Sequence, residues 1–386
     1  MSCKQILLIN WDHTRKDLSQ QLFRLSDQFE LVFIFEYKKV KDYPGLRVIY
    51  WNDFSTPEEL LDKIKPSQII FHDIESFHQI ALTITARAKN IRTIVLEHGL
   101  RRAFEVANTI RSEKNTGIEI SISSIQTVRF LLASLSKLKF SVWPSCFRLL
   151  FLRKFQGLTK GLRSCQYEFR QADLYINFTE RNSGYIKERD GIKEEKLRYI
   201  GNPQFDEFFQ KLRSSKLPEK KKRILLFDTP FEQIPGNKIS LEQRKEFIQL
   251  LSVFFRKQGL SLTVKLHPRS DPKEFQLPDV EFISEGDLFE LIMGSEGCVF
   301  IHNSGLIPLS MLYNKTILFN AIPALNTDLL SDAYIPIYEF NAGQIEKIEL
   351  KEIDDKIREK VVKDYFLSTE GNSESKLRKL LTDQAL

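Results

Sequence analysis

The sequence has few cysteines and no segment that could cross a membrane as a helix. Its four cysteines form no CxxC pair and have no histidine at metal-ligand spacing. We therefore interpret them as reduced thiols, not as a disulfide framework or a zinc site. No apolar stretch reaches the ~18 uncharged residues that a transmembrane helix needs, and the first ten residues lead into a strand without the architecture of a signal peptide. These absences predict a cytoplasmic protein.

Acidic residues are missing from one long window, residues 120–167. The window contains eight Lys or Arg residues, more than the net charge of +6 of the whole chain, and many Phe and Leu residues lie between them. A basic stretch with an aromatic face is typical of contact with an anionic membrane. Two other interpretations stay open: a helix pair packed on the core with a solvated basic face, and a surface for an acidic polymer or nucleic acid. The residues expected at the membrane are Trp143, Arg148, Arg153 and Lys154, in a partly helical element over 129–163.

Strand and helix patterns alternate along both halves of the chain, which at 386 residues has room for two domains. Such alternation with short connections is typical of doubly wound parallel α/β sheets. We predict an N-terminal domain over 1–202 with a basic insertion at about 125–167, a C-terminal domain over 203–345 and a helical tail over 346–386. Residues 197–203 are expected to be a linker.

Histidines close two apolar strands, one in each half. Residues 92–99 read RTIVLEHG and end in His98 and Gly99, whereas residues 261–269 read SLTVKLHPR and contain His267, Pro268 and Arg269. The carboxyl edge of an open parallel sheet is where ligands bind. We therefore expect a cleft between two similar domains with one of these histidines on each wall.

A Ser/Gly turn in the second half predicts a phosphate site. Residues 300–306 read FIHNSGL, a strand that runs into a turn and a helix. Backbone N–H groups in such a turn bind phosphate, and we expect Asn303, Ser304 and Gly305 to form the site beside His267 and Arg269. Asp228 ends another strand of the same half and is a further candidate for contact or positioning.

Acceptor-side candidates lie in the first half. His98 can act as a general base, since an imidazole titrates near neutrality. Glu97, Gly99, His13 and Asp73 follow strands whose ends should share the same edge. For each of these, a surface polar group without a catalytic role is the alternative.

The order of these motifs, His-Gly, then Ile-Gly-Asn-Pro, then Lys-Leu-His-Pro, then Asn-Ser-Gly, resembles GT-B glycosyltransferases. It resembles most the bacterial surface-polysaccharide group of teichoic-acid glycerophosphotransferases, polysialyltransferases and capsular Kdo transferases, and more distantly the UDP-N-acetylglucosamine 2-epimerases. The resemblance implies two Rossmann-like domains, an acceptor-side base at His98, donor-phosphate contact by His267 and Pro268, and a nucleotide-phosphate turn at Ser304 and Gly305. The sequence departs from that pattern because the helix after the turn has no Glu for the donor ribose.

We therefore expect an inverting glycosyltransferase or polyol-phosphate transferase of capsule, lipopolysaccharide or related surface-glycan synthesis. It would use a CMP-, CDP- or UDP-activated donor and a glycan or lipid-linked acceptor at the inner face of the cytoplasmic membrane, with no nucleic-acid partner. The chain contains no Asp-x-Asp, so we predict no metal and no cofactor. A non-catalytic GT-B-like scaffold and an epimerase-like enzyme are the alternatives.

Overall fold

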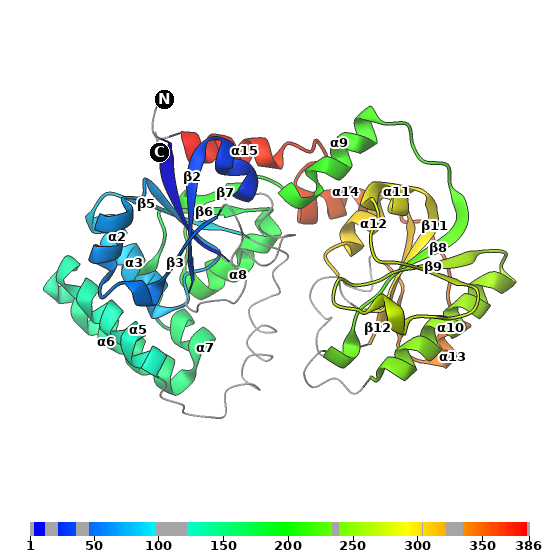
Figure 1. Cartoon of the computed structure of the whole chain (residues 1–386), viewed down its shortest axis with the longest axis horizontal. Helices are drawn as coiled ribbons and strands as arrows, with labels where there is room; N and C mark the ends of the chain where they lie inside the picture. The colour runs from blue at the N-terminus through cyan, green and yellow to red at the C-terminus, as the bar shows by residue number, and fades with distance from the viewer. Residues whose placement is uncertain are drawn as a thin grey trace. The chain divides into compact units, whose positions relative to one another are not determined.

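The computed structural model describes residues 4–11, 22–35, 46–97, 122–233, 239–302, 304–321 and 335–383 of the chain. The chain folds into two compact units (Figure 1). The first unit comprises residues 1–204 together with 372–386, and the second comprises residues 205–371.

The first unit is built on a seven-stranded sheet whose paired strands are all parallel. Its order is β3-β2-β1-β4-β5-β6-β7. The strands are β1 (Gln5–Asn10), β2 (Phe29–Phe35), β3 (Arg47–Tyr50), β4 (Gln68–Phe71), β5 (Arg92–Leu96), β6 (Leu174–Asn177) and β7 (Leu197–Tyr199). Successive strand residues point to opposite faces, so Leu8 joins one core cluster while Leu7 and Ile9 join the other. The sheet is therefore apolar on both faces, as a doubly wound fold requires.

Helices cover these faces, and two of them begin at side-chain caps. The helices are α2 (Pro57–Ile64), α3 (Phe77–Ala88), α5 (Ile122–Ser134), α6 (Trp143–Gln156), α7 (Leu158–Arg163) and α8 (Glu180–Asp190). Thr56 caps α2, and Ser76 and Gln79 form a capping box at α3. The helix α5 packs on α3 (Figure 1), which brings the basic segment onto the core of the first unit.

The predicted linker at 197–203 is wrong in its first half. Leu197 is buried, and residues Leu197–Tyr199 pair with β6 as strand β7. The backbone N–H groups of Ile200 and Gly201 then donate to the carbonyl groups of Asn177 and Phe178. The chain leaves the sheet only after Gly201, so the boundary between the units follows residue 204.

The second unit repeats the strand order of the first. Its parallel sheet has the order β10-β9-β8-β11-β12-β13. Counted from the first strand of each unit, both sheets contain the order 3-2-1-4-5-6 of the Rossmann fold. The strands are β8 (Lys221–Phe227), β9 (Ser261–Lys265), β10 (Val280–Ile283), β11 (Ser295–Phe300), β12 (Lys315–Asn320) and β13 (Ile337–Glu339). The predicted pair of doubly wound α/β domains is thus confirmed.

Short and long helices complete the second unit. They are α9 (Asp206–Ser214), α10 (Leu241–Lys257), α11 (Leu288–Met293), α12 (Ile307–Tyr313), α13 (Ala342–Ile345) and α14 (Asp355–Val361). After α14 the chain returns to the first unit as α15 (Ser373–Thr382). There Arg378 forms an ion pair with Asp27, and Gln68 donates to the carbonyl group of Leu381.

Candidate functional site

The carboxyl edge of the second sheet brings together the donor-side candidates. Asp228 follows β8, His267 follows β9, and Ser304 follows β11. Strand β8 lies between β9 and β11, and the strand order reverses between β8 and β11. Ligands of open α/β sheets bind at such a switch point, so the predicted phosphate residues lie where the topology favours a ligand.

A tight turn orients the imidazole of His267. The N–H of Ser270 donates to the carbonyl oxygen of His267 at 2.8 Å, and the N–H of Arg269 donates to His267 Nδ1 at 3.1 Å. Pro268 occupies the second position of the turn, where its fixed φ is favoured. Because Nδ1 accepts a hydrogen bond, the neutral ring carries its proton on Nε2. The Arg269 side chain is exposed at the same turn.

The Ser304 turn is partly described. Ser304 is half-buried, and its Oγ accepts the N–H of Leu306 at 3.2 Å. Gly305 is exposed, and Asn303 lies outside the described residues. In the following helix α12, Ser310 is fully buried and hydrogen-bonds Thr316 at 2.7 Å. Ser310 therefore offers no hydroxyl to a donor ribose.

Asp228 is buried, so of the two roles predicted for it the structure favours positioning. Its Oδ2 accepts the Ser270 hydroxyl at 3.1 Å, and its Oδ1 lies 3.7 Å from Nε of the fully buried Arg244. Burial raises the pKa of Asp228, although Arg244 and Ser270 act in the opposite direction. The sequence predicted Asp228 but missed Arg244, which comes from α10 with no motif around it.

The first unit leaves the acceptor-side prediction partly open. His98, Gly99 and His13 lie outside the described residues, so the role of His98 stays a prediction. Glu97 is buried, and its Oε2 accepts the N–H of Phe178 at 2.5 Å. That hydrogen bond ties β5 to β6, and it gives Glu97 a structural role.

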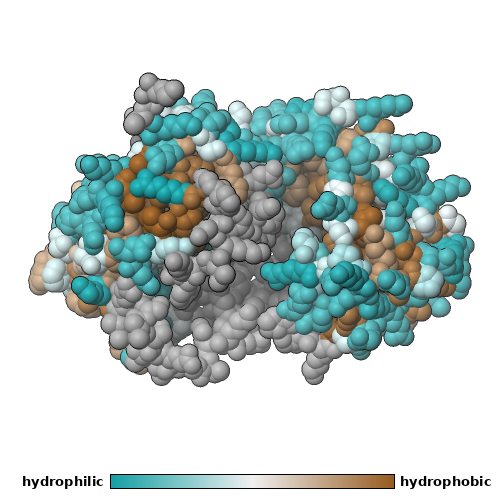
Figure 2. Space-filling model, viewed as in Figure 1, coloured by the Kyte–Doolittle hydropathy of each residue, from teal (hydrophilic) through white to brown (hydrophobic). Residues whose placement is uncertain are grey.

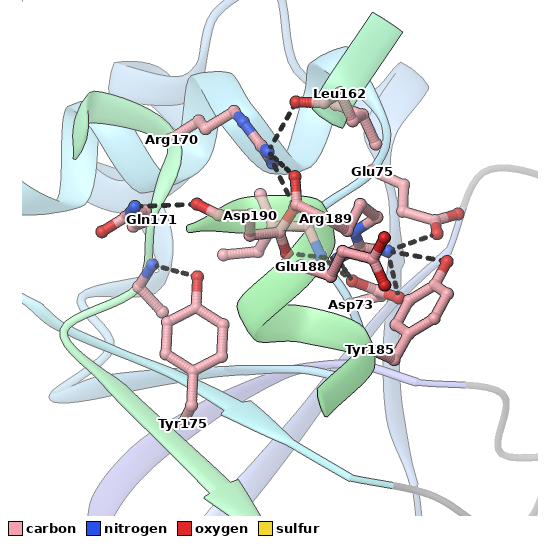
Figure 3. A network of polar contacts seen from close by, with 12 residues as sticks. Asp73, Glu75, Leu162, Arg170, Gln171, Tyr175, Tyr185, Glu188, Arg189 and Asp190 are labelled. Carbon is pink, nitrogen blue, oxygen red and sulfur yellow. Dashed lines mark hydrogen bonds and ion pairs between the residues drawn. The ribbon is translucent and has the colours of Figure 1, made fainter. Parts of the chain in front are cut away.

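Asp73 belongs to a buried ion network (Figure 3). Its two carboxylate oxygens accept from the Arg189 guanidinium at 2.5 and 2.9 Å, and Arg189 also contacts Glu75 and Asp190. Burial by itself lowers the pKa of Arg189, but Asp190 and Asp73 raise it well above its ordinary value. This pairing corrects the prediction of Asp73 as an acceptor-side group.

The network extends from Asp190 to a second buried arginine. Arg170 donates to Asp190 at 2.7 Å and to the backbone carbonyl groups of Cys165 and Leu162. Sequence analysis missed Arg170, Arg189 and Asp190, because the charges converge from separate segments and no spacing signals them.

The basic segment forms α5, α6 and α7, and one side of α6 is apolar and exposed. Phe147, Phe151 and Phe155 are 49%, 60% and 66% exposed, and Phe140 just before the helix is 79% exposed. Residues four apart lie on one face of a helix, so the three helical side chains form a stripe. Figure 2 shows apolar atoms among hydrophilic ones on the side of the first unit where these helices lie. We call these four phenylalanines the aromatic ridge.

The predicted membrane residues divide into two groups. Arg148 and Lys154 are exposed beside the aromatic ridge. Arg153 instead stacks on the Phe77 ring at 3.9 Å, and burial lowers its pKa to about 10. Trp143 is half-buried and donates its indole N–H to the carbonyl group of Leu135 at 3.1 Å. Arg153 and Trp143 were therefore wrongly assigned, since both face the core.

The described residues hold neither a candidate metal cluster nor a candidate membrane span. No group of three or more His, Cys, Asp or Glu residues in them could hold a metal ion. No helix in the same part of the chain is long and apolar enough to span a bilayer.

Comparison with solved structures defines the class. The calicheamicin glycosyltransferase CalG4 superposes with a TM-score of 0.54 at 14% identity, over 100% of both chains. A variant of the wall teichoic acid polymerase TagF superposes with a TM-score of 0.50 at 13% identity, over 98% of this chain and 88% of that one. The two Rossmann-like units and these similarities define a GT-B fold.

The family follows from the sequence. The model of the alpha-2,8-polysialyltransferase family matches residues 52–288, more than half of the chain. The chain belongs to this family, and it is a glycosyltransferase of bacterial surface-glycan synthesis. The resemblance proposed from the motifs is thereby confirmed. No curated protein matches the sequence significantly.

Proposed function

We propose that the chain transfers a sugar from a nucleotide-activated donor to a growing surface glycan, with inversion at the anomeric carbon and without a metal. The observation that carries this proposal is the turn that makes His267 Nδ1 an acceptor, which leaves the ring proton on Nε2, at the sheet edge that also carries Ser304. A donor at this position can hydrogen-bond a phosphate oxygen. Among CMP-, CDP- and UDP-activated units, the family name favours a sialic acid unit and a sialylated acceptor.

In the proposed reaction, an acceptor hydroxyl attacks the anomeric carbon while the bond from that carbon to the phosphate oxygen breaks. The nucleotide phosphate leaves with the bonding electrons, and His98 takes the hydroxyl proton. His267, Arg269 and the Ser304 turn would balance the charge of the leaving phosphate. In this proposal the first unit accepts the proton of the acceptor hydroxyl, and the second unit balances the negative charge of the leaving phosphate.

A calorimetric titration with CMP, CDP, UDP and GDP tests the donor site. Ser304→Ala should weaken binding of the preferred nucleotide by about 0.5–3 kcal/mol through a lost hydrogen bond. Ser310→Ala is the matched control, because Ser310 is buried in the adjacent helix. A wild-type protein that binds none of the four nucleotides contradicts the proposal.

Turnover separates an enzyme from a scaffold that only binds nucleotide. His98→Asn should reduce transfer ~10²–10⁴-fold if His98 is the general base, while nucleotide affinity stays at the wild-type level. Unchanged transfer in this variant would exclude His98 as the base.

We propose in addition that the aromatic ridge enters the interface of the anionic inner leaflet of the cytoplasmic membrane. Phe151 and Phe155 contact each other with ring centroids 4.4 Å apart, and Lys154 Nζ lies 5.9 Å from the Phe155 ring. Exposed aromatic rings beside cations match the chemistry of a lipid headgroup region. This placement would bring the enzyme to a lipid-linked acceptor.

Sedimentation with liposomes containing anionic lipid tests the membrane proposal. Changing Phe147, Phe151 and Phe155 to Ser should abolish binding, and R148E with K154E in the otherwise wild-type chain should weaken it. Leu217→Ser is the control, since Leu217 is 55% exposed in the second unit. Binding should also fall with salt, because the screening length shrinks from ~10 Å at 0.1 M to ~3 Å at 1 M. Wild-type protein that ignores these liposomes at low salt contradicts the proposal.

A further inference from the structure

The loops after β8 and β9 are tied together by two side-chain hydrogen bonds. Ser270 is buried and donates to Asp228 Oδ2 at 3.1 Å, and Gln233 Nε2 donates to the carbonyl oxygen of Arg269 at 3.1 Å. Both ties end on the turn that starts at His267. The position of that turn is therefore set by residues of a neighbouring strand.

Arg244 holds the other side of this arrangement. Its Nη1 donates to the carbonyl oxygen of Thr229 at 2.9 Å and lies 3.2 Å from a Glu232 carboxylate oxygen, and its guanidinium stacks 4.8 Å from the Phe275 ring. Arg244 is fully buried. Its positive charge compensates the negative charge of Asp228. The two side chains form no hydrogen bond, since 3.7 Å between Arg244 Nε and Asp228 Oδ1 is too long for one.

Several polar atoms here lack a hydrogen-bond partner among the described residues. They are Asp228 Oδ1 and Arg244 Nε and Nη2. Each such buried atom costs free energy. These atoms lie beside the turn that carries His267, because the other oxygen of Asp228 accepts the Ser270 hydroxyl.

We propose that Ser270, held by Asp228 and braced by Arg244, is a positioning residue that sets the orientation of His267. Ser270 is adjacent to Arg269, whose N–H fixes Nδ1 as the acceptor, and Ser270 closes the turn on the His267 carbonyl group. Release of the Ser270 hydroxyl from Asp228 frees the turn to move and the imidazole to reorient. The inference rests on the proposed function for its effect on donor binding, but the orientation of His267 can be measured without a donor.

The first experiment records the imidazole nitrogen signals of full-length protein labelled with ¹⁵N-histidine, with His267→Ala to assign them. Ser270→Ala should shift or broaden the His267 signals, and Ser270→Thr, which keeps the hydroxyl, should restore them. Ser252→Ala is the matched control, because Ser252 is a buried serine of α10 that donates to the carbonyl group of Asp279. Unchanged His267 signals in Ser270→Ala overturn the proposal, whether or not the protein binds nucleotide.

The second experiment is a double-mutant cycle on nucleotide affinity. Ser270→Ala should weaken binding of the preferred nucleotide ~3–10-fold. This is the loss expected if the ordering of His267 contributes about as much as one neutral hydrogen bond. In the His267→Ala background the same change should have no effect. Full additivity of the two changes overturns the proposal. A wild-type protein without nucleotide affinity instead refutes the proposed function and leaves the nitrogen signals to decide the role of Ser270.

Discussion

The two units share a strand order but bury charge differently at the carboxyl edges of their sheets. In the first unit, Asp73 accepts two hydrogen bonds from Arg189. In the second, Asp228 and Arg244 approach each other without a hydrogen bond. A buried carboxylate whose hydrogen bonds are made inside the protein has a structural role, whereas one left partly unsatisfied beside a loop can serve that loop. The same residue type at the same edge therefore has different roles in the two units.

The largest effect should follow from Arg189→Met, which breaks the matched network of the first unit. The change leaves Asp73 and Asp190 buried without their main partner, and we expect it to lower the free energy of unfolding by ~3–5 kcal/mol. All three tryptophans of the chain, Trp11, Trp51 and Trp143, lie in the first unit, so tryptophan fluorescence in urea measures this unit alone.

Lys187→Met is the matched control for Arg189→Met. Lys187 lies on the same helix and pairs with Glu194 at the surface, where ion pairs add little. Equal losses in the two variants would show that the buried network contributes no more than an exposed pair.

His78 should make the first unit sensitive to acid. The ring stacks on Trp51 with centroids 4.9 Å apart, and neither of its nitrogens has a hydrogen-bond partner among the described residues. Burial lowers the pKa of His78 from 6.5 to about 4. The unfolded chain therefore binds the proton more readily, and the free energy of unfolding should fall by roughly 3 kcal/mol as the pH drops from 6.5 to 4. His78→Phe should lack this loss of stability. If tryptophan fluorescence gave the same pH dependence of the free energy of unfolding for both proteins, the prediction would be contradicted.

His267→Ala should show which of the two sheet edges binds the nucleotide. We expect nucleotide affinity to fall ~10–100-fold, since the variant loses a hydrogen bond to a charged phosphate. His72→Ala is the control at the first edge, where His72 Nδ1 lies 3.0 Å from the carbonyl oxygen of Asn10. Calorimetry that finds equal losses in both variants would contradict the assignment of the donor site to the second unit.

The smallest effect, and one of opposite sign to that of His78, should come from Asp228. Its pKa is raised by burial, so the native state retains the proton over a pH range in which the unfolded chain has released it. Stability therefore falls as pH rises through that range, just above the ordinary pKa of an aspartate. Asp228→Asn should lack this slope. Urea unfolding followed by far-UV circular dichroism from pH 4 to 7 measures the difference between the two proteins, and a difference that is constant with pH would contradict the prediction.

Elements with strong local signals were predicted well. Helix α10 begins at the capping box of Ser240 and Gln243, and α11 begins at the Asp287 cap, so both helices start at signals that are local in the sequence. Strand β7 was missed because it is three residues long, lies at the edge of the sheet and is followed by a Gly-Asn-Pro sequence typical of loops. Its pairing with β6 is a tertiary contact that no local pattern contains.

Candidate residues that follow a strand lie at the predicted sheet edge, whereas the predictions were mistaken where helix phase or tertiary pairing decides. Arg153 shares the inner face of α6 with Cys146 and Leu149, which are buried, whereas Phe151 and Phe155 are on the outer face. A count of charges over the segment does not consider which face of the helix each residue occupies. The helical spacing from Cys146 and Leu149 would have placed Arg153 on the inner face. Arg244 pairs with Asp228 only in the folded unit, so no signal in the sequence identifies it.

The return of α15 to the first unit has a consequence for the order of folding on the ribosome. Arg92 donates to the carbonyl groups of Leu380 and Asp383, and Leu377 and Leu381 are part of the first unit's core. The ribosome must synthesise all of residues 205–371 before it makes this helix. Domains usually complete folding in the order of synthesis. Here, when residue 371 has been made, the second unit has all its residues, whereas the first unit still lacks α15. The unit that begins the chain is therefore the one that finishes folding last.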